Sequence, residues 1–143
     1  AVKVFRADPR GGQILLKEVQ DPERFGVASL VEDRVTTIVE KPDCPQSNLA
    51  VTGCYFFDAQ VFEIIQGLSP SERGELEITD VNNWFVERGK MKHHMVEGWW
   101  TDAGTIPSLH RAAALVAAEQ DNPVLSGFGH GATGGALIAQ TSP

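Results

Sequence analysis

Short runs of apolar and β-branched residues, separated by turn residues, fill most of the first half of the chain and predict strands. Val, Ile and Thr favour strands because their branched side chains pack well on a pleated surface. Residues 51–57 form the strongest of these runs. Glu32 and Asp33 separate two runs closely enough to predict a β-hairpin. The predicted strands cover residues 1–5, 14–16, 25–31, 35–39, 51–57 and 92–96.

In three later segments the apolar residues recur with a period near 3.6 residues, which predicts helices. Asp58 and Thr79 stand immediately before two of them, where a side-chain oxygen can accept a hydrogen bond from a free backbone N–H group. The third helix is the longest and begins at Thr105, with Pro107 tolerated in its first turn. The three predicted helices cover residues 59–66, 80–88 and 105–120.

Helices that alternate with strands, beside a run of consecutive strands, predict an α/β fold with a mixed sheet, a β-hairpin appendage and flanking helices. The chain has 143 residues, of which 42% are hydrophobic and 22% charged, and this composition is typical of a globular domain. A chain of this length buries about 68–70% of its unfolded surface. We therefore expect one domain over residues 1–123, followed by a Gly-rich tail over residues 124–143.

The charge balance limits the kinds of partner. Twelve basic and nineteen acidic residues give a net charge of −7, so nucleic acid is a poor candidate ligand because its phosphates need a positive surface. No apolar run approaches the roughly 20 residues that span a bilayer, and the first residues lack a signal-peptide pattern. We expect a cytoplasmic protein that binds neither nucleic acid nor membrane. Cys44 and Cys54 fit no metal or redox motif and are predicted to be thiols.

Glu40 and Lys41 lie at the end of a predicted strand and are the first candidates for ligand binding. The residue before a proline is biased toward extended backbone, so Lys41 before Pro42 is expected to continue the strand. The carboxylate could then accept hydrogen bonds from hydroxyl groups while the ammonium binds a phosphate. The alternative is a pair of solvated charges at the edge of a hairpin.

Val51, Gly53 and Tyr55 alternate along the strongest strand and are expected to share one face of the sheet. A glycine between these two side chains would leave a gap beneath the phenol, in which a sugar ring could lie. The alternative is an ordinary core strand whose glycine lets a neighbouring helix approach closely.

Two further charged residues lie on predicted loops. Asp102 stands just before a helix, where its carboxylate could bind magnesium or could simply form a turn near the helix start. The guanidinium of Arg73 could bind a phosphate with two hydrogen bonds, or could form a surface ion pair with Glu72 or Glu75.

Five motifs of this chain closely resemble, in order and spacing, the C-terminal half of glucose-1-phosphate thymidylyltransferase, a sugar nucleotidyltransferase. The likeness extends from about Ile14 to Gln120, and five motifs at matching spacing make it far more specific than any single one. The motifs occupy residues 21–27, 40–42, 50–58, 70–82 and 100–105.

The resemblance implies a Rossmann-like nucleotidyltransferase fold and a family activity that joins glucose 1-phosphate to dTTP and releases pyrophosphate. It implies that magnesium is the cofactor of a complete enzyme. No catalytic residue is assigned. The substrate-binding residues that it implies are Gly26, Glu40, Lys41, Val51, Tyr55 and Arg73, and Asp102 is the implied magnesium ligand.

The departures from the family pattern predict a truncated protein. Nothing in the sequence resembles the family's glycine-rich nucleotide loop or the strand that carries a second magnesium-binding aspartate, and Ala103 replaces a usual threonine. We expect a part that binds a sugar 1-phosphate, is inactive alone, and forms a homodimer or associates with a missing N-terminal half. The alternative is a non-catalytic binding or oligomerisation module that reuses the truncated fold.

Overall fold

The computed structural model describes residues 1–120 and 138–139. The chain divides into two compact units, residues 1–95 and residues 96–143, and each is described by itself. The predicted boundary between residues 123 and 124 lies outside the described residues. Within the described ranges, no helix combines the length and the apolar character needed to cross a membrane.

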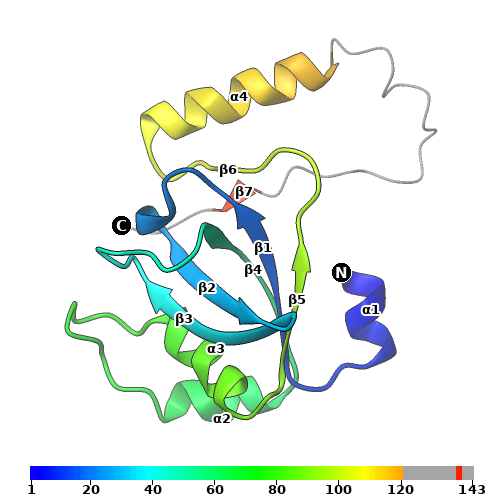
Figure 1. Cartoon of the computed structure of the whole chain (residues 1–143), viewed down its shortest axis with the longest axis vertical. Coiled ribbons are helices and arrows are strands. Elements are labelled where there is room, and N and C mark those ends of the chain that lie inside the picture. Colours follow the sequence, from blue (N-terminus) through cyan, green and yellow to red (C-terminus); the bar gives the residue numbers. More distant parts are fainter. Residues whose placement is uncertain (121–137, 140–143) are drawn as a thin grey trace. The chain divides into compact units, whose positions relative to one another are not determined.

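A five-stranded mixed sheet forms the centre of the first unit (Figure 1). The strands lie side by side in the order β3-β2-β4-β1-β5, and β1 pairs antiparallel with β4 and parallel with β5. The mixed sheet and the predicted hairpin of β2 and β3 are thereby confirmed. The bounds are Gly12–Glu18 for β1, Gly26–Val31 for β2, Arg34–Glu40 for β3, Leu49–Phe57 for β4 and Met91–Met95 for β5.

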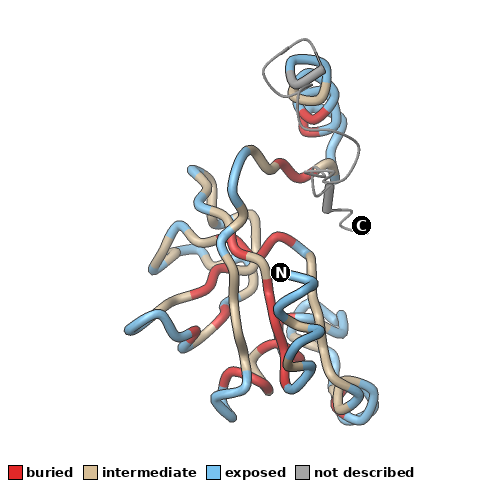
Figure 2. The backbone as a smooth tube through the Cα atoms, turned by 90° about the vertical axis from the view of Figure 1, so that its right-hand side faces the viewer, coloured by how far each residue is buried: buried red, intermediate tan, exposed pale blue. Residues whose placement is uncertain are grey.

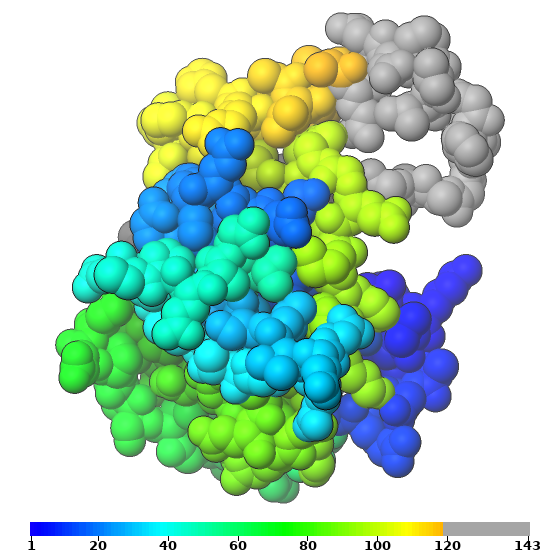
Figure 3. Space-filling view, viewed as in Figure 1, coloured from blue at the N-terminus to red at the C-terminus, as the bar shows by residue number. Residues whose placement is uncertain are grey.

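The sheet curls, because its two outermost strands approach each other around the hairpin turn. Asp33 lies in the turn between β2 and β3, and its Oδ1 is 3.4 Å from Nε2 of His93 on β5. Figure 3 shows the hairpin strands on the surface in light blue and cyan, above green helices. The curl gives the sheet a concave side that helices can cover.

Two helices, α2 over Gln60–Gln66 and α3 over Ile78–Glu87, lie against the sheet. Asn83 of α3 fixes the helix to the outer strand β3: its Oδ1 accepts a hydrogen bond from the Ile38 N–H at 3.0 Å, and its Nδ2 donates to the Ile38 carbonyl at 2.7 Å. This pair replaces the hydrogen bonds that a further strand would supply. The outer strand is therefore partly protected from pairing with another chain.

The core of this unit consists of two neighbouring apolar clusters, and the buried stretches gather in the middle strands in Figure 2. Alternating apolar positions of β1 place Ile14 and Leu16 on one face, and both are fully buried. The second cluster lies under the helices and contains Phe85, which is also fully buried. Burial of these side chains is the main driving force for the fold.

The prediction of a strand at residues 1–5 is wrong, because α1 over Val2–Ala7 is a helix. Phe5 donates its backbone N–H to the Ala1 carbonyl at 3.0 Å, and its ring packs 5.7 Å from the ring of Phe56 on β4. As a helix, α1 can pack the ring of Phe5 against the sheet. A run of five residues is too short for its sequence pattern to separate a helix from a strand.

Thr79 does not cap α3. The helix begins at Ile78, the residue before Thr79, and its N-cap residue is Glu77. Asp58 is not the N-cap residue of α2 either, since that residue is Ala59, but Asp58 Oδ1 still accepts a hydrogen bond from the Gln60 N–H at 2.9 Å. Thr79 lies in the first turn of α3 and uses its hydroxyl for a contact with β3. The tertiary partner of Thr79 has thus replaced the local capping bond.

β4 contains a β-bulge at Gly53, which interrupts the regular alternation from which the gap beneath Tyr55 was inferred. Leu16 pairs with Val51 and Ile14 pairs with Tyr55, so three residues of β4 oppose one residue of β1. Gly53 is exposed and has a φ of 77°, a left-handed conformation that favours glycine. Val51 and Tyr55 still share a face, as predicted, because their partners on β1 are two residues apart.

The second unit contains α4 over Ile106–Gln120 and a two-stranded parallel sheet of β6, Thr101–Asp102, and β7, Ile138–Ala139. Thr105 and Ser108 cap the helix reciprocally: the Ser108 N–H donates to Thr105 Oγ1 at 3.3 Å, and the Thr105 N–H donates to Ser108 Oγ at 3.0 Å. The longest helix begins at Ile106, one residue after the predicted start at Thr105, and has Pro107 in its first turn.

Candidate functional site

Glu40 is the centre of a polar cluster at the end of β3. Its Oε2 accepts a hydrogen bond from the Thr79 hydroxyl at 2.6 Å. Its neighbour across the hairpin is Gly26, where an added Cβ would lie 3.2 Å from this Oε2 and 3.6 Å from the Thr79 hydroxyl. The missing side chain thus lets the carboxylate lie close to the backbone of β2. Glu40 is held in one orientation and keeps a quarter of its side chain exposed.

Arg73 reaches the same carboxylate from the loop before α3. Its guanidinium lies 3.9 Å from Glu40 Oε1, 3.4 Å from Glu77 Oε1 and 3.3 Å from Glu75 Oε2. Ser71 fixes this loop, since its Oγ donates to Glu77 Oε1 at 3.0 Å and accepts the Arg73 N–H at 3.2 Å. A phosphate that binds Arg73 has to compete with three carboxylates.

Lys41 does not have the extended backbone that its position before proline predicts. Its φ is 42°, in the left-handed region, and its backbone N–H donates to the Phe25 carbonyl at 3.0 Å. Non-glycine residues adopt this conformation rarely, and it recurs at functional sites where the surrounding structure enforces it. The long-range hydrogen bond to Phe25 has overridden the local preference. Lys41 is exposed and follows Glu40 directly in the chain.

Val51 and Tyr55 lie on the face of β4 that packs against the core. Val51 is 8% exposed, and the Tyr55 ring stacks on Phe57 with 5.9 Å between the ring centroids. Burial, with a smaller contribution from the negative charge of Glu40, raises the pKa of Tyr55 to about 12. The phenol is therefore neutral at pH 7 and able to donate a hydrogen bond, within electrostatic reach of Glu40.

Tyr55 is the only tyrosine of the chain, so its ionisation can be followed without interference. We expect a midpoint of about 12 in a spectrophotometric pH titration of the folded protein, and a lower one in Glu40→Gln, which removes the negative charge. Since the unfolded chain releases this proton near pH 10, the folded state binds more protons above that pH. The free energy of unfolding should then fall between pH 10 and 12, by on the order of 2–3 kcal/mol. An unchanged midpoint in Glu40→Gln would contradict this assignment.

Asp102 belongs to the second unit and is buried, with 6% of its surface exposed. Its Oδ1 accepts a hydrogen bond from the Gly104 N–H at 3.0 Å, which forms a turn just before α4. In the described part of the chain, no group of three or more His, Cys, Asp or Glu side chains could hold a metal ion. Magnesium usually keeps several water ligands and takes only one or two protein carboxylates, so Asp102 by itself does not define a magnesium site.

The structure thus brings together three of the predicted residues by direct contact: Gly26, Glu40 and Arg73. It places Tyr55 within reach of the Glu40 charge and Val51 in the core cluster against which Tyr55 packs. The hydrogen bond of Thr79 to Glu40 was not predicted, because the position of Thr79 near a helix start indicated a capping role.

A family comparison identifies the fold that carries this site. Residues 1–119 match the model of the nucleotidyl transferase family. The chain belongs to that family. This membership agrees with the family resemblance of the five motifs.

Individual nucleotidyl transferases are also similar to this chain. The low-salt glycan biosynthesis nucleotidyltransferase Agl11 of Haloferax volcanii is 45% identical over 118 residues, which are 80% of this chain and 33% of that protein. The glucose-1-phosphate thymidylyltransferase of Neisseria meningitidis is 42% identical over 123 residues, 84% of this chain and 43% of that protein. This chain therefore spans less than half the length of these two relatives.

A solved nucleotidyl transferase structure supports the architecture. A crystal structure assigned to a glucose-1-phosphate thymidylyltransferase of Bacillus anthracis, with bound sucrose, is 52% identical and superposes with a TM-score of 0.74. The match covers 80% of this chain and 46% of that one. The predicted α/β fold, a curled mixed sheet with flanking helices, is confirmed as that of a nucleotidyl transferase.

Proposed function

We propose that this chain supplies the sugar-1-phosphate-binding part of a glucose-1-phosphate thymidylyltransferase-like protein. The observation that supports the proposal best is the fixed orientation of Glu40. Thr79 holds one carboxylate oxygen at 2.6 Å, and the absent side chain of Gly26 leaves room beside it. A carboxylate with accessible lone pairs accepts hydrogen bonds from sugar hydroxyl groups, and such charge-assisted bonds are strong.

The neighbouring residues have complementary roles in this proposal. The backbone of Gly26 contacts a sugar hydroxyl, and Lys41 and Arg73 bind the phosphate. Val51 and the neutral phenol of Tyr55 form the wall of the sugar pocket. The positions of these groups around Glu40 support the assignment, since Arg73 contacts Glu40 and the Glu40 charge acts on Tyr55.

We further propose that the chain corresponds to the C-terminal half of such an enzyme, and that nucleotide binding depends on residues outside it. Two observations support this: the chain spans 33% and 43% of the two curated relatives, and it lacks a glycine-rich nucleotide loop. Asp102 would contribute one carboxylate to a magnesium site whose other ligands lie elsewhere. Nucleotidyl transfer depends on positioning the reactants and on neutralising the charge of the phosphates. The chain alone should therefore not catalyse the reaction.

Calorimetric titration with glucose 1-phosphate tests the binding function. The wild-type chain should bind, and Glu40→Ala and Lys41→Ala should each weaken binding at least about tenfold, because each removes a charged hydrogen-bonding group. Glu63→Ala and Lys3→Ala are matched controls, since both side chains are exposed on helices outside the site. Equal affinity of Glu40→Ala and the wild type would reject the proposed site.

The alternative, a non-catalytic oligomerisation module, is favoured by apolar surface on α2, where Phe62 is 68% exposed and Ile65 is 43% exposed. Sedimentation velocity of the same samples separates the two functions. A stable dimer with no glucose 1-phosphate binding would support the module. Turnover of dTTP and glucose 1-phosphate by the wild type, lost in Asp102→Ala, would refute the inactivity of the isolated chain.

A further inference from the structure

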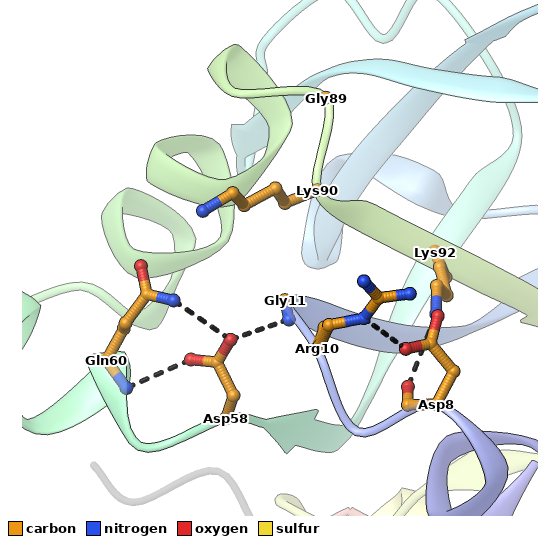
Figure 4. A pocket seen from close by; sticks show the side chains of 8 residues that line it. All are labelled: Asp8, Arg10, Gly11, Asp58, Gln60, Gly89, Lys90 and Lys92. Atoms are coloured by element: carbon orange, nitrogen blue, oxygen red, sulfur yellow. Dashed lines mark hydrogen bonds and ion pairs between the residues drawn. The ribbon is translucent and has the colours of Figure 1, made fainter.

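A cavity of about 450 Å³ lies where β1 and β5 begin and β4 ends, and it shares no lining residue with the proposed sugar site. Figure 4 shows that its polar side chains come from three segments that are far apart in the chain. One segment follows α1, the second joins the end of β4 to the start of α2, and the third leads into β5 and includes its second residue, Lys92. Six of its lining residues carry the argument: Asp8, Arg10, Asp58, Gln60, Lys90 and Lys92.

Both acidic side chains of this cavity are already engaged within it. Asp58 Oδ2 accepts hydrogen bonds from the Gly11 N–H at 2.7 Å and from Gln60 Nε2 at 3.1 Å. Asp8 accepts from Arg10 Nε at 2.6 Å and from Lys92 Nζ at 2.5 Å. These two hydrogen bonds lower the pKa of Asp8 to about 2, so it remains ionised and paired at neutral pH.

Two cations keep donors available to a ligand. The backbone of Lys90 donates a hydrogen bond to the Phe85 carbonyl and accepts one from the Gly12 N–H. The side-chain ammonium of Lys90 forms no hydrogen bond or ion pair with a residue of the described ranges. Arg10 bonds Asp8 through Nε, and the two terminal nitrogens of its guanidinium have no hydrogen-bond partner among the described residues. The lining therefore has three cations and two carboxylates, a local charge of +1, in a chain of net charge −7.

We propose that this cavity binds the phosphate group of a small molecule through Arg10 and Lys90. Its volume lies in the range of about 300–1,000 Å³ that is typical of small-molecule sites. A guanidinium presents parallel N–H groups that match phosphate oxygens, and an ammonium adds a compact charge with three donors. The ion pairs of Asp8 hold Arg10 and Lys92 on one wall, so the phosphate lies between that wall and Lys90.

Titration of the ¹⁵N-labelled 143-residue chain with inorganic phosphate, at ionic strength held constant with sodium chloride, tests this site. We expect saturable shifts of the backbone amide signals of Gly11, Gly89 and Lys90. The double variant Arg10→Gln, Lys90→Gln should bind phosphate at least about tenfold more weakly, because it removes both cations. Lys90→Gln alone should also weaken binding and leaves folding unaffected, since its ammonium has no structural contact.

Two controls separate this site from the proposed sugar site and from general ionic effects. Lys41→Ala should leave the phosphate-induced shifts unchanged even where it removes glucose 1-phosphate binding. Lys3→Gln removes an exposed positive charge outside the cavity and should have no effect. Shifts that fail to saturate, that equal those produced by chloride, or that persist undiminished in the double variant would overturn the proposal.

Discussion

We expect the replacement of Phe85 with alanine to lower the free energy of unfolding by about 3–5 kcal/mol, which is the typical cost of truncating a buried aromatic residue. Phe85 has no exposed surface and lies between the sheet and the helices. Its ring is 5.4 Å from that of Phe57 and 5.1 Å from that of Trp84, measured between centroids. Alanine leaves a cavity there because β4 and α3 are fixed by other contacts and cannot close the space.

Urea denaturation followed by circular dichroism measures this loss, with the linear extrapolation applied to both proteins. Phe62→Ala is the matched control: it makes the same chemical change on α2, where the ring is 68% exposed. We expect that variant to lie within about 0.5 kcal/mol of the wild type. Equal losses in the two variants would show that Phe85 does not occupy the core position described.

Gly11→Ala is the second substitution with a large expected effect, again about 3–5 kcal/mol. Gly11 has a φ of 80°, and a Cβ there would lie 2.3 Å from the Lys90 carbonyl oxygen. This oxygen belongs to the backbone and accepts the Gly12 N–H, so it cannot move aside without breaking the start of β1. Gly11 also donates its own N–H to Asp58, which ties β1 to the end of β4.

Gly74→Ala separates the backbone strain of a left-handed residue from the steric clash with the Lys90 carbonyl oxygen. Gly74 has a nearly identical φ of 78°, but no atom lies within 4 Å of the added Cβ. Alanine at this position should cost only the left-handed backbone strain, about 1–2 kcal/mol. Thermal unfolding of both variants provides the comparison. If Gly11→Ala were no less stable than Gly74→Ala, the close approach of Lys90 to Gly11 would be wrong.

Local patterns predicted most elements of the fold correctly. The β-branched runs around Val35 and Val51 became β3 and β4, and Asp58 accepts a backbone hydrogen bond at the start of α2. These predictions succeeded because apolar alternation and side-chain capping involve neighbours within a few residues. The motifs around Glu40 and Arg73 likewise indicated the family, and the match over residues 1–119 supports it.

The geometry of the candidate site was much less predictable. Lys41 was expected to be extended, but a hydrogen bond to Phe25 holds it in the left-handed region. Gly53 was expected to face the same side as Tyr55, but a β-bulge removes it from that face. In both cases a contact with a distant segment of the chain overrides the preference of the residue itself.

The sequence by itself determined most of the strands and helices and the family to which the chain belongs, and it indicated candidates for a sugar-phosphate site. The tertiary structure alone decided that Thr79 orients Glu40 across 39 residues and that Lys92 pairs with Asp8 across 84. It also decided that Arg10 and Lys90 share one cavity. The physical reason is that periodicity and capping act between neighbours, whereas these contacts exist only after the curled sheet has brought distant strand ends together.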